Sequence, residues 1–74
     1  MDLTAAIRKV TDEYNASNVP EGQTADEAEV VWEIRGALTA AELESWQATV
    51  APDVIQAYRV VLDAGEDDVT RALR

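Results

Sequence analysis

The chain has 74 residues, and its 15 acidic and six basic residues give a formal net charge of −9. This length predicts a single small domain over residues 1–74, and the acidity excludes general charge attraction to polyanions such as nucleic acids. Cysteine and histidine are both absent, so disulfides, the usual zinc ligands, a thiol nucleophile and a general base near neutral pH are excluded.

The first predicted element is a helix that starts near the N-terminus. Either Asp2 or Thr4 can serve as its N-cap, and we expect it to end near residues 15–18. A proline and a glycine then break the pattern, which predicts a loop at about 16–23. Apolar residues recur at helical spacing along this first helix, at Leu3, Ile7, Val10 and Tyr14.

The second predicted helix begins at a capping box formed by Thr24 and Glu27, in which the hydroxyl caps the Glu27 amide and the carboxylate reaches back. This helix runs to about Gly36. A second capping box, Thr39 to Glu42, starts the third helix. The inward residues of the two helices are predicted to be Val31, Ile34 and Leu38 for the second, and Leu43, Trp46 and Val50 for the third.

Two more helices complete the pattern. Pro52 suits the first turn of a fourth helix, and Gly65 is expected to stop that helix. The apolar stripe of the fourth helix consists of Val54, Ile55, Tyr58, Val61 and Leu62. A short last helix carries Val69, Ala72 and Leu73, behind the acids Glu66, Asp67 and Asp68. The sequence therefore predicts an all-α fold, a compact bundle of four to five short helices.

The corner between the second and third helices has the outline of a helix-turn-helix DNA reader. Such a reader needs a small residue about one turn before the glycine and an apolar one directly before it, but these positions hold Trp32 and Arg35. No arginine or lysine lies between Arg35 and Arg59 to contact phosphates. We therefore expect a capped helix–helix corner and no direct nucleic-acid binding.

Unbalanced acid is concentrated in the middle of the chain. Residues 20–45 contain seven acids against Arg35 alone, for a net charge of −6, whereas residues 1–19 and 46–74 have net charges of −1 and −2. Glu21 is the first of the seven. The bases of the flanking segments are predicted to form local i,i+4 pairs, namely Arg8 with Asp12, Lys9 with Glu13, and Arg71 with Asp67.

On a helical wheel, Asp26, Glu29 and Glu33 fall within about 60° of one another and form one acidic stripe. Trp32 lies at the margin of this stripe, where it either contacts a partner or covers the edge of a thin core. Trp46, by contrast, is predicted to be in the core. The sequence predicts a partner-binding surface within residues 21–44, made of Asp26, Glu29, Trp32, Glu33, Glu42 and Glu44.

Nothing in the sequence predicts an enzyme. Ser17 and Ser45 lack a Gly-x-Ser-x-Gly context, and the three glycines form no phosphate loop. Residues 63–68 lack the ligand pattern of a calcium loop and suit a helix N-terminus better. In size, acidity and helical content the chain resembles an acyl carrier protein, but that family modifies the serine of an Asp-Ser-Leu motif, which is absent here. We expect no catalytic residue, no metal and no cofactor.

These observations predict a protein-binding protein that docks an acidic helical face on a basic surface of a macromolecular partner. An inhibitor of the kind encoded by phages and mobile elements, which mimics nucleic-acid charge, is the sharpest version. The alternatives are a structural subunit of a larger assembly, such as a virion component, and a small acidic domain of halophile type. Five arginines against one lysine fit both a GC-rich genome and a halophile.

The sequence also bears on location and assembly. No apolar run approaches the 18 or so residues that cross a membrane, and no secretory signal is recognisable, so a cytoplasmic or virion-internal protein is expected. Hydrophobic residues make up 47% of the chain, but 13 of them are alanine. Because such a core is thin, the chain is a candidate for homo-oligomer formation.

Overall fold

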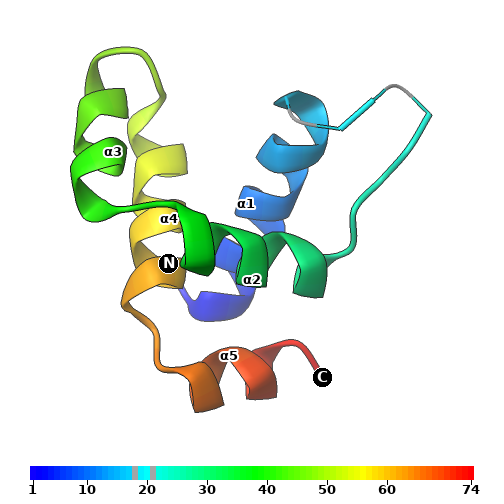
Figure 1. Cartoon of the computed structure of the whole chain (residues 1–74). Helices are drawn as coiled ribbons and strands as arrows, with labels where there is room; N and C mark the ends of the chain where they lie inside the picture. The colour runs from blue at the N-terminus through cyan, green and yellow to red at the C-terminus, as the bar shows by residue number, and fades with distance from the viewer. Residues whose placement is uncertain (18, 21) are drawn as a thin grey trace.

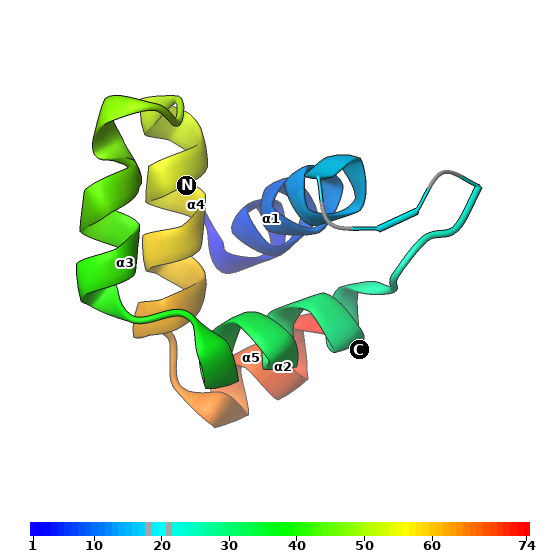
Figure 2. The same cartoon turned by 45° about the horizontal axis from the view of Figure 1, so that its top comes forward.

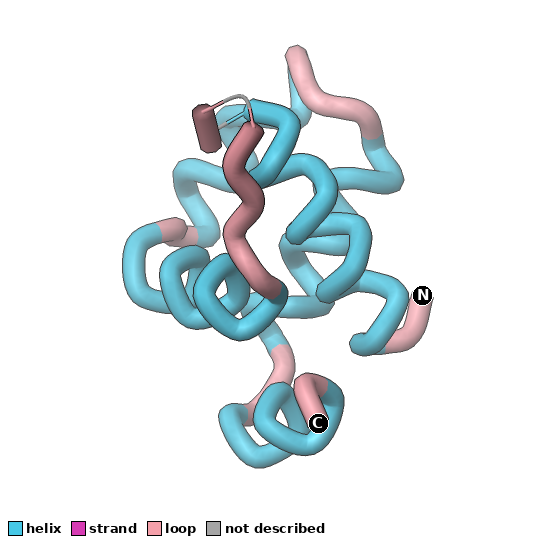
Figure 3. The backbone as a smooth tube through the Cα atoms, turned by 90° about the vertical axis from the view of Figure 1, so that its right-hand side faces the viewer, coloured by secondary structure: helices cyan, strands magenta, loops and turns pink. Residues whose placement is uncertain are grey.

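Helices account for all the regular structure in the described part of the chain. The computed structural model describes residues 1–17, 19–20 and 22–74. It contains helices α1 (Leu3–Ser17), α2 (Glu27–Ala37), α3 (Ala40–Ser45), α4 (Pro52–Asp63) and α5 (Glu66–Ala72), and a 3₁₀ turn, η1 (Trp46–Ala48). Figures 1 and 3 show these helices and no strand among the described residues. The predicted all-α fold is confirmed.

The helices enclose one core, which is centred on α1 and α4. These two helices pack most closely against each other, and α2 packs against both of them. Helix α3 runs beside α4, as Figure 2 shows, and α5 contacts α1 near the C-terminus of the chain. The radius of gyration, 11.7 Å, is that of a compact chain of this length.

The core is small and rich in valine. The largest fully buried side chains are those of Ile7, Val10, Val30, Val31, Val61 and Val69. Most predicted inward positions are buried, but Leu3, Tyr14, Leu38, Trp46, Val50 and Leu62 are only half-buried and pack against the core from its margin. Val30 and Ala57 are fully buried although the predicted stripes did not include them.

The start of α2 differs from the prediction. The N-cap is Asp26 rather than Thr24, and its Oδ1 accepts a hydrogen bond of 2.9 Å from the Glu29 amide. The reason for this later start is a contact between Ala25 and Asn15, which is ten residues earlier in the chain. Asn15 Oδ1 accepts a hydrogen bond of 2.7 Å from the Ala25 N–H, and Asn15 Nδ2 donates one of 3.1 Å to the Ala25 carbonyl oxygen. Ala25 is therefore held outside the helix, and the capping box at residues 24–27 is wrong.

The end of α4 also differs. Gly65 was expected to stop α4, but its φ of −71° is not left-handed, and it is the N-cap of α5. Helix α4 ends because the chain becomes extended at Ala64. In place of a glycine cap, Arg35 Nη1 donates to the carbonyl oxygens of Val61 and Ala64, at 2.7 and 2.6 Å.

The other predicted helix starts are confirmed. Asp2 Oδ1 accepts a hydrogen bond of 2.7 Å from the Ala5 amide, Thr39 Oγ1 caps the Glu42 amide at 3.2 Å, and Pro52 is the first residue of α4. The third helix was expected to carry Trp46 and Val50, but α3 ends at Ser45, Trp46 begins η1 and Val50 lies beyond η1. Helix α1 ends at Ser17, within the predicted range, so the loop begins later than residue 16. Asn18, which belongs to that loop, and Glu21 lie outside the described residues.

None of the three predicted i,i+4 ion pairs forms among the described residues. Lys9 Nζ instead lies 2.7 Å from the carboxylate of Asp53 and joins α1 to α4. Arg71 pairs with Asp68, three residues before it, at 3.8 Å, and not with the predicted Asp67, four residues before it. The prediction considered only neighbours on the same helix, whereas the packing of α1 on α4 gives Lys9 a partner from another element.

Candidate functional site

The six residues of the predicted partner-binding surface are all exposed. We call the five carboxylates among them, Asp26, Glu29, Glu33, Glu42 and Glu44, the acidic face. They lie on α2, on α3 and at the N-cap of α2. The helical wheel assumed that Asp26 is part of the helix, but Asp26 is the N-cap and precedes it. The predicted acidic stripe along α2 is therefore reduced to Glu29 and Glu33.

The one base of the segment does not neutralise the acidic face. Arg35 is half-buried, and its guanidinium is engaged by the two carbonyl groups at the end of α4. Within the described residues, the ion pairs are Lys9–Asp53 and Arg71–Asp68, so no carboxylate of the acidic face has a cation within 4.0 Å. Within the described residues, the charge of this surface is therefore not neutralised by an ion pair.

Trp32 lies on the same helix as Arg35 and is exposed at 41%. The Arg35 guanidinium carbon lies over its ring, 5.7 Å from the ring centroid. This geometry is that of a cation–π contact. One side of the indole is thus covered by a cation of the protein itself, and the residue as a whole is 41% exposed.

Two residues of the acidic face converge on one groove. Glu33 of α2 and Glu42 of α3 line a groove of about 400 Å³, which we call the aromatic groove. Its other lining residues come from α1, α2, η1 and α4, and they are Tyr14, Ile34, Ala37, Leu38, Trp46 and Tyr58. The Trp46 and Tyr58 rings meet edge to face, with centroids 5.5 Å apart.

Tyr58 is the most deeply placed polar side chain of this groove, with 7% of its surface exposed. Burial raises the pKa of its hydroxyl above the usual value, and the nearby Glu13 carboxylate adds to this shift. The phenol therefore stays protonated and neutral at physiological pH. The groove thus combines two carboxylates with aromatic rings and an uncharged hydroxyl.

The remaining predicted site residues lie elsewhere. Glu44 lines a different hollow with Arg35, Arg59 and Asp63, and Trp32 lines a third one beside Glu66. Asp26 and Glu29 are exposed and line none of the five main hollows. The structure therefore brings together Glu33 and Glu42 but not the whole predicted set.

The sequence did not predict that aromatic residues line a groove. Tyr58 was predicted to be in the core and is buried there, whereas Trp46, predicted to be in the core, and Tyr14, predicted to face inward, are half-buried. The available signal was chemical, because tyrosine and tryptophan have polar tips that favour positions at the boundary between core and solvent. The place of these rings on the surface of the core depends on how four elements pack against one another. The pattern of a single helix contains no information about that packing.

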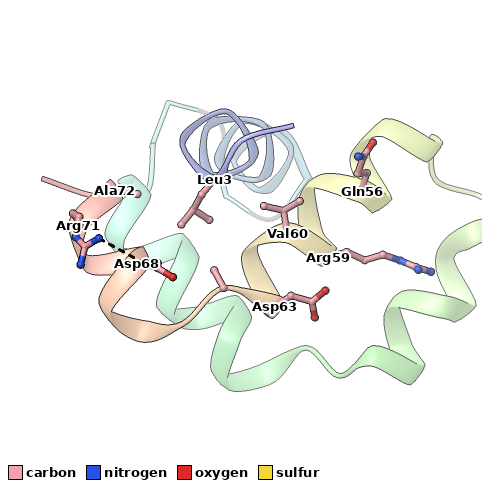
Figure 4. A pocket seen from close by; sticks show the side chains of 9 residues that line it. Leu3, Gln56, Arg59, Val60, Asp63, Asp68, Arg71 and Ala72 are labelled. Atoms are coloured by element: carbon pink, nitrogen blue, oxygen red, sulfur yellow. Dashed lines mark ion pairs between the residues drawn. The ribbon is translucent and has the colours of Figure 1, made fainter.

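A second, more apolar groove lies on another side of the molecule. It has a volume of about 670 Å³ and lies between α1, α4 and α5. Figure 4 shows Leu3, Val60 and Ala72 around this apolar groove, with the Asp68–Arg71 ion pair and the charged residues Arg59 and Asp63 at its rim. The mixed charges of its rim distinguish it from the purely acidic rim of the aromatic groove.

The described residues show neither a metal-binding cluster nor a membrane-spanning helix. The described residues contain no group of three or more acidic side chains placed to hold a metal ion. Asp68, from the segment that resembled a calcium loop, pairs with Arg71, and its neighbours form the first turn of α5. None of the helices described is long and apolar enough to cross a membrane.

Comparisons with protein families, with curated proteins and with solved structures found no match to this chain.

Proposed function

We propose that this chain is a non-enzymatic binding protein that docks its acidic face onto a basic surface of another protein. The observation that carries the proposal is the state of Arg35. This residue is bound to the end of α4 at 2.6 and 2.7 Å, and among the described residues no ion pair involves a carboxylate of the acidic face. In its sharpest version the protein is an inhibitor that presents carboxylates where a nucleic acid would present phosphates.

Charge repulsion within the free protein supports this proposal. Glu29 and Glu33 are four residues apart on α2, and side chains at this spacing lie about 5–6 Å from each other. This separation is shorter than the screening length of about 8 Å at physiological salt. A cationic partner relieves the repulsion on binding, and complementary charge also speeds association.

The test starts from affinity capture with the tagged protein, using a lysate of the organism that encodes it, followed by mass spectrometry. The captured partner is then titrated with the double variant Glu29→Lys/Glu33→Lys. A matched control is Asp12→Lys/Asp63→Lys, which makes the same change of charge at exposed positions of α1 and α4. Lysine at the C-terminal end of α4 is also compatible with the helix dipole.

We expect the first variant to lose most of its affinity, mainly through a slower association rate, and the control to lose little. Affinity should also fall as salt is raised. If the control variant weakens binding as much as the first, the attraction is only due to net charge and the acidic face is not the interface. If the captured proteins have acidic or neutral surfaces, the proposal fails.

A structural subunit of a larger assembly is the second candidate, and the apolar groove between α1, α4 and α5 favours it. An inhibitor is expected to be a monomer or dimer whose complexes dissociate in salt. A subunit is expected to multimerise through an apolar surface and to resist salt. Sedimentation at low and high salt measures the oligomeric state and so separates the two candidates. The third alternative, an acidic domain of halophile type, would remain monomeric and would have no basic partner.

A further inference from the structure

We propose that the aromatic groove is a receptor for one arginine side chain. The inference rests on the proposed function, since it assumes a basic protein as the partner, and it adds the chemical group that is recognised and the residues that hold it. The groove lies between Glu33 and Glu42, which belong to two different helices, α2 and α3.

The two carboxylates supply the charge complementarity. A guanidinium group is planar and carries five N–H donors in a fixed fork, so it can bond two carboxylates at once. Neither Glu33 nor Glu42 has a cation within ion-pair distance among the described residues. Glu42 Oε1 accepts one hydrogen bond of 3.2 Å, from Thr39 Oγ1, and because a carboxylate has about four lone-pair sites, both side chains can still accept from a ligand.

The aromatic rings favour arginine over lysine. Guanidinium is weakly hydrated and stacks on aromatic faces, whereas the lysine ammonium is compact and strongly hydrated. Tyr14, Trp46 and Tyr58 all line the groove, so a cation that enters it meets aromatic rings as well as carboxylates. The same protein already places a guanidinium over an indole, at Arg35 and Trp32, with 5.7 Å between the guanidinium carbon and the ring centroid.

The Tyr58 side chain adds a polar group to the residues that line the groove. Its side chain is more than nine-tenths buried and lines the groove, yet the hydroxyl makes no hydrogen bond to any residue that the structure describes. Because no fully buried side-chain oxygen in the described residues lacks a partner, this hydroxyl must retain contact with solvent. A neutral hydroxyl oxygen in this position can accept a hydrogen bond from a guanidinium N–H.

The test uses the whole protein and a short capped peptide, acetyl-Gly-Arg-Gly-amide, with lysine and citrulline versions for comparison. The readout is the NMR signal of the indole N–H groups. The chain has two tryptophans, Trp46 in the groove and Trp32 outside it, so one spectrum contains its own control. We expect the arginine peptide to shift the Trp46 signal in a saturable way and to leave the Trp32 signal in place.

Citrulline has the shape of arginine without its charge, so its peptide should bind at least about tenfold more weakly, as expected for lost hydrogen bonds between charged groups. The lysine peptide should also bind more weakly than the arginine peptide. The arginine peptide is titrated up to roughly 50 mM, a concentration above the dissociation constant of most specific contacts. If the Trp46 signal does not move over this range, the inference is overturned.

Matched variants locate the binding. Glu33→Gln/Glu42→Gln should weaken arginine binding at least about tenfold, whereas Glu29→Gln/Glu44→Gln makes the same change of charge outside the groove and should have little effect. Tyr14→Leu should weaken binding about two- to fivefold through the loss of a ring. Trp32→Leu, which removes an aromatic residue outside the groove, should leave it unchanged.

Two results separate this inference from the proposed function. If both glutamine pairs weaken peptide binding equally, the arginine is attracted to the acidic face as a whole; the groove is then not a receptor, while the proposed function stands. If the groove variants alone lose arginine binding but Glu29→Lys/Glu44→Lys, which changes the acidic face outside the groove, leaves the captured partner bound, the receptor stands and the docking of the wider acidic face fails.

Discussion

Arg35 Nη1 donates a hydrogen bond of 2.6 Å to the carbonyl oxygen of Ala64, 29 residues further along the chain. A second bond, of 2.7 Å, reaches the carbonyl oxygen of Val61. The last carbonyl groups of a helix have no partners within the helix, and a cation at this end also interacts favourably with the helix dipole. One side chain of α2 therefore closes the end of α4, and in the part of the chain that the structure describes Arg35 forms no ion pair with the acidic face.

Removal of this cap should destabilise the protein. We expect Arg35→Gln to lower the free energy of unfolding by about 2–3 kcal/mol, since hydrogen bonds from charged groups contribute about 1.5–3 kcal/mol and the carbonyls are part-buried. Urea denaturation followed by circular dichroism measures the change. Arg59→Gln is the control, because Arg59 is an exposed arginine of α4, and it should change stability by less than about 0.5 kcal/mol. Equal losses in the two variants would contradict a capping role.

The corrected start of α2 makes a second prediction. Asp26→Ala should destabilise the protein by about 1 kcal/mol, the usual cost of removing an N-cap side chain. Thr24→Ala should be nearly neutral, because Thr24 is exposed and lies two residues before the cap. Thermal unfolding of the two variants gives the answer, and a larger loss for Thr24→Ala would restore the capping box at residues 24–27.

The helices themselves could be predicted because their signals are local. Thr39 and Pro52 act within one turn of the helix that they start, and apolar spacing of 3.6 residues reports on one helix at a time. The misplaced boundaries have long-range causes. Asn15 acts on Ala25 across ten residues, and no local pattern contains that contact.

The candidate site was predictable only in part for the same reason. Exposure of Glu29, Glu33, Glu42 and Glu44 follows from their positions on two amphipathic helices. The convergence of Glu33 and Glu42 on one groove depends instead on how α1, α2, α3 and α4 pack. Tyr58 illustrates the limit, because its burial in the core was predicted from the apolar stripe of the fourth helix, whereas its place in the lining of a groove depends on the neighbouring elements.

The Asn15 contact makes a third prediction, about the connection between α1 and α2. Asn15→Ala removes both hydrogen bonds to Ala25 and should cost about 1–3 kcal/mol, because a part-buried N–H and carbonyl lose their partner. Asn15→Asp keeps the acceptor for the Ala25 N–H but loses the donor, so it should cost less. Hydrogen exchange at the Ala25 amide is the direct measurement. The exchange should be fast in the alanine variant and slow in the aspartate variant, and equal rates would show that the loop is held by other contacts.

The last prediction concerns pH and the ion pair between Lys9 and Asp53, whose charged atoms lie 2.7 Å apart across α1 and α4. The hydrogen bond from Lys9 lowers the pKa of Asp53 below its usual value, and the same bond raises the pKa of Lys9. A carboxyl with a lowered pKa contributes stability above its unfolded pKa of about 3.9, and this contribution is lost as pH falls through the folded value. A lysine with a raised pKa contributes below about 10.4, and its contribution is lost as pH rises through the folded value.

The stability difference between the natural protein and Asp53→Asn should therefore be constant from about pH 5 to pH 9 and should shrink at both ends. Asp53 is exposed and Lys9 is half-buried, so the difference is expected to be small and to decrease further in salt. Urea midpoints measured across this range, with and without salt, test the expectation. Asp12→Asn, which removes an exposed carboxylate of α1 outside the two ion pairs described, is the matched control. A difference for Asp53→Asn that stays constant below pH 3 would show that the residue acts through its shape or as a first-turn helix residue and not through its charge.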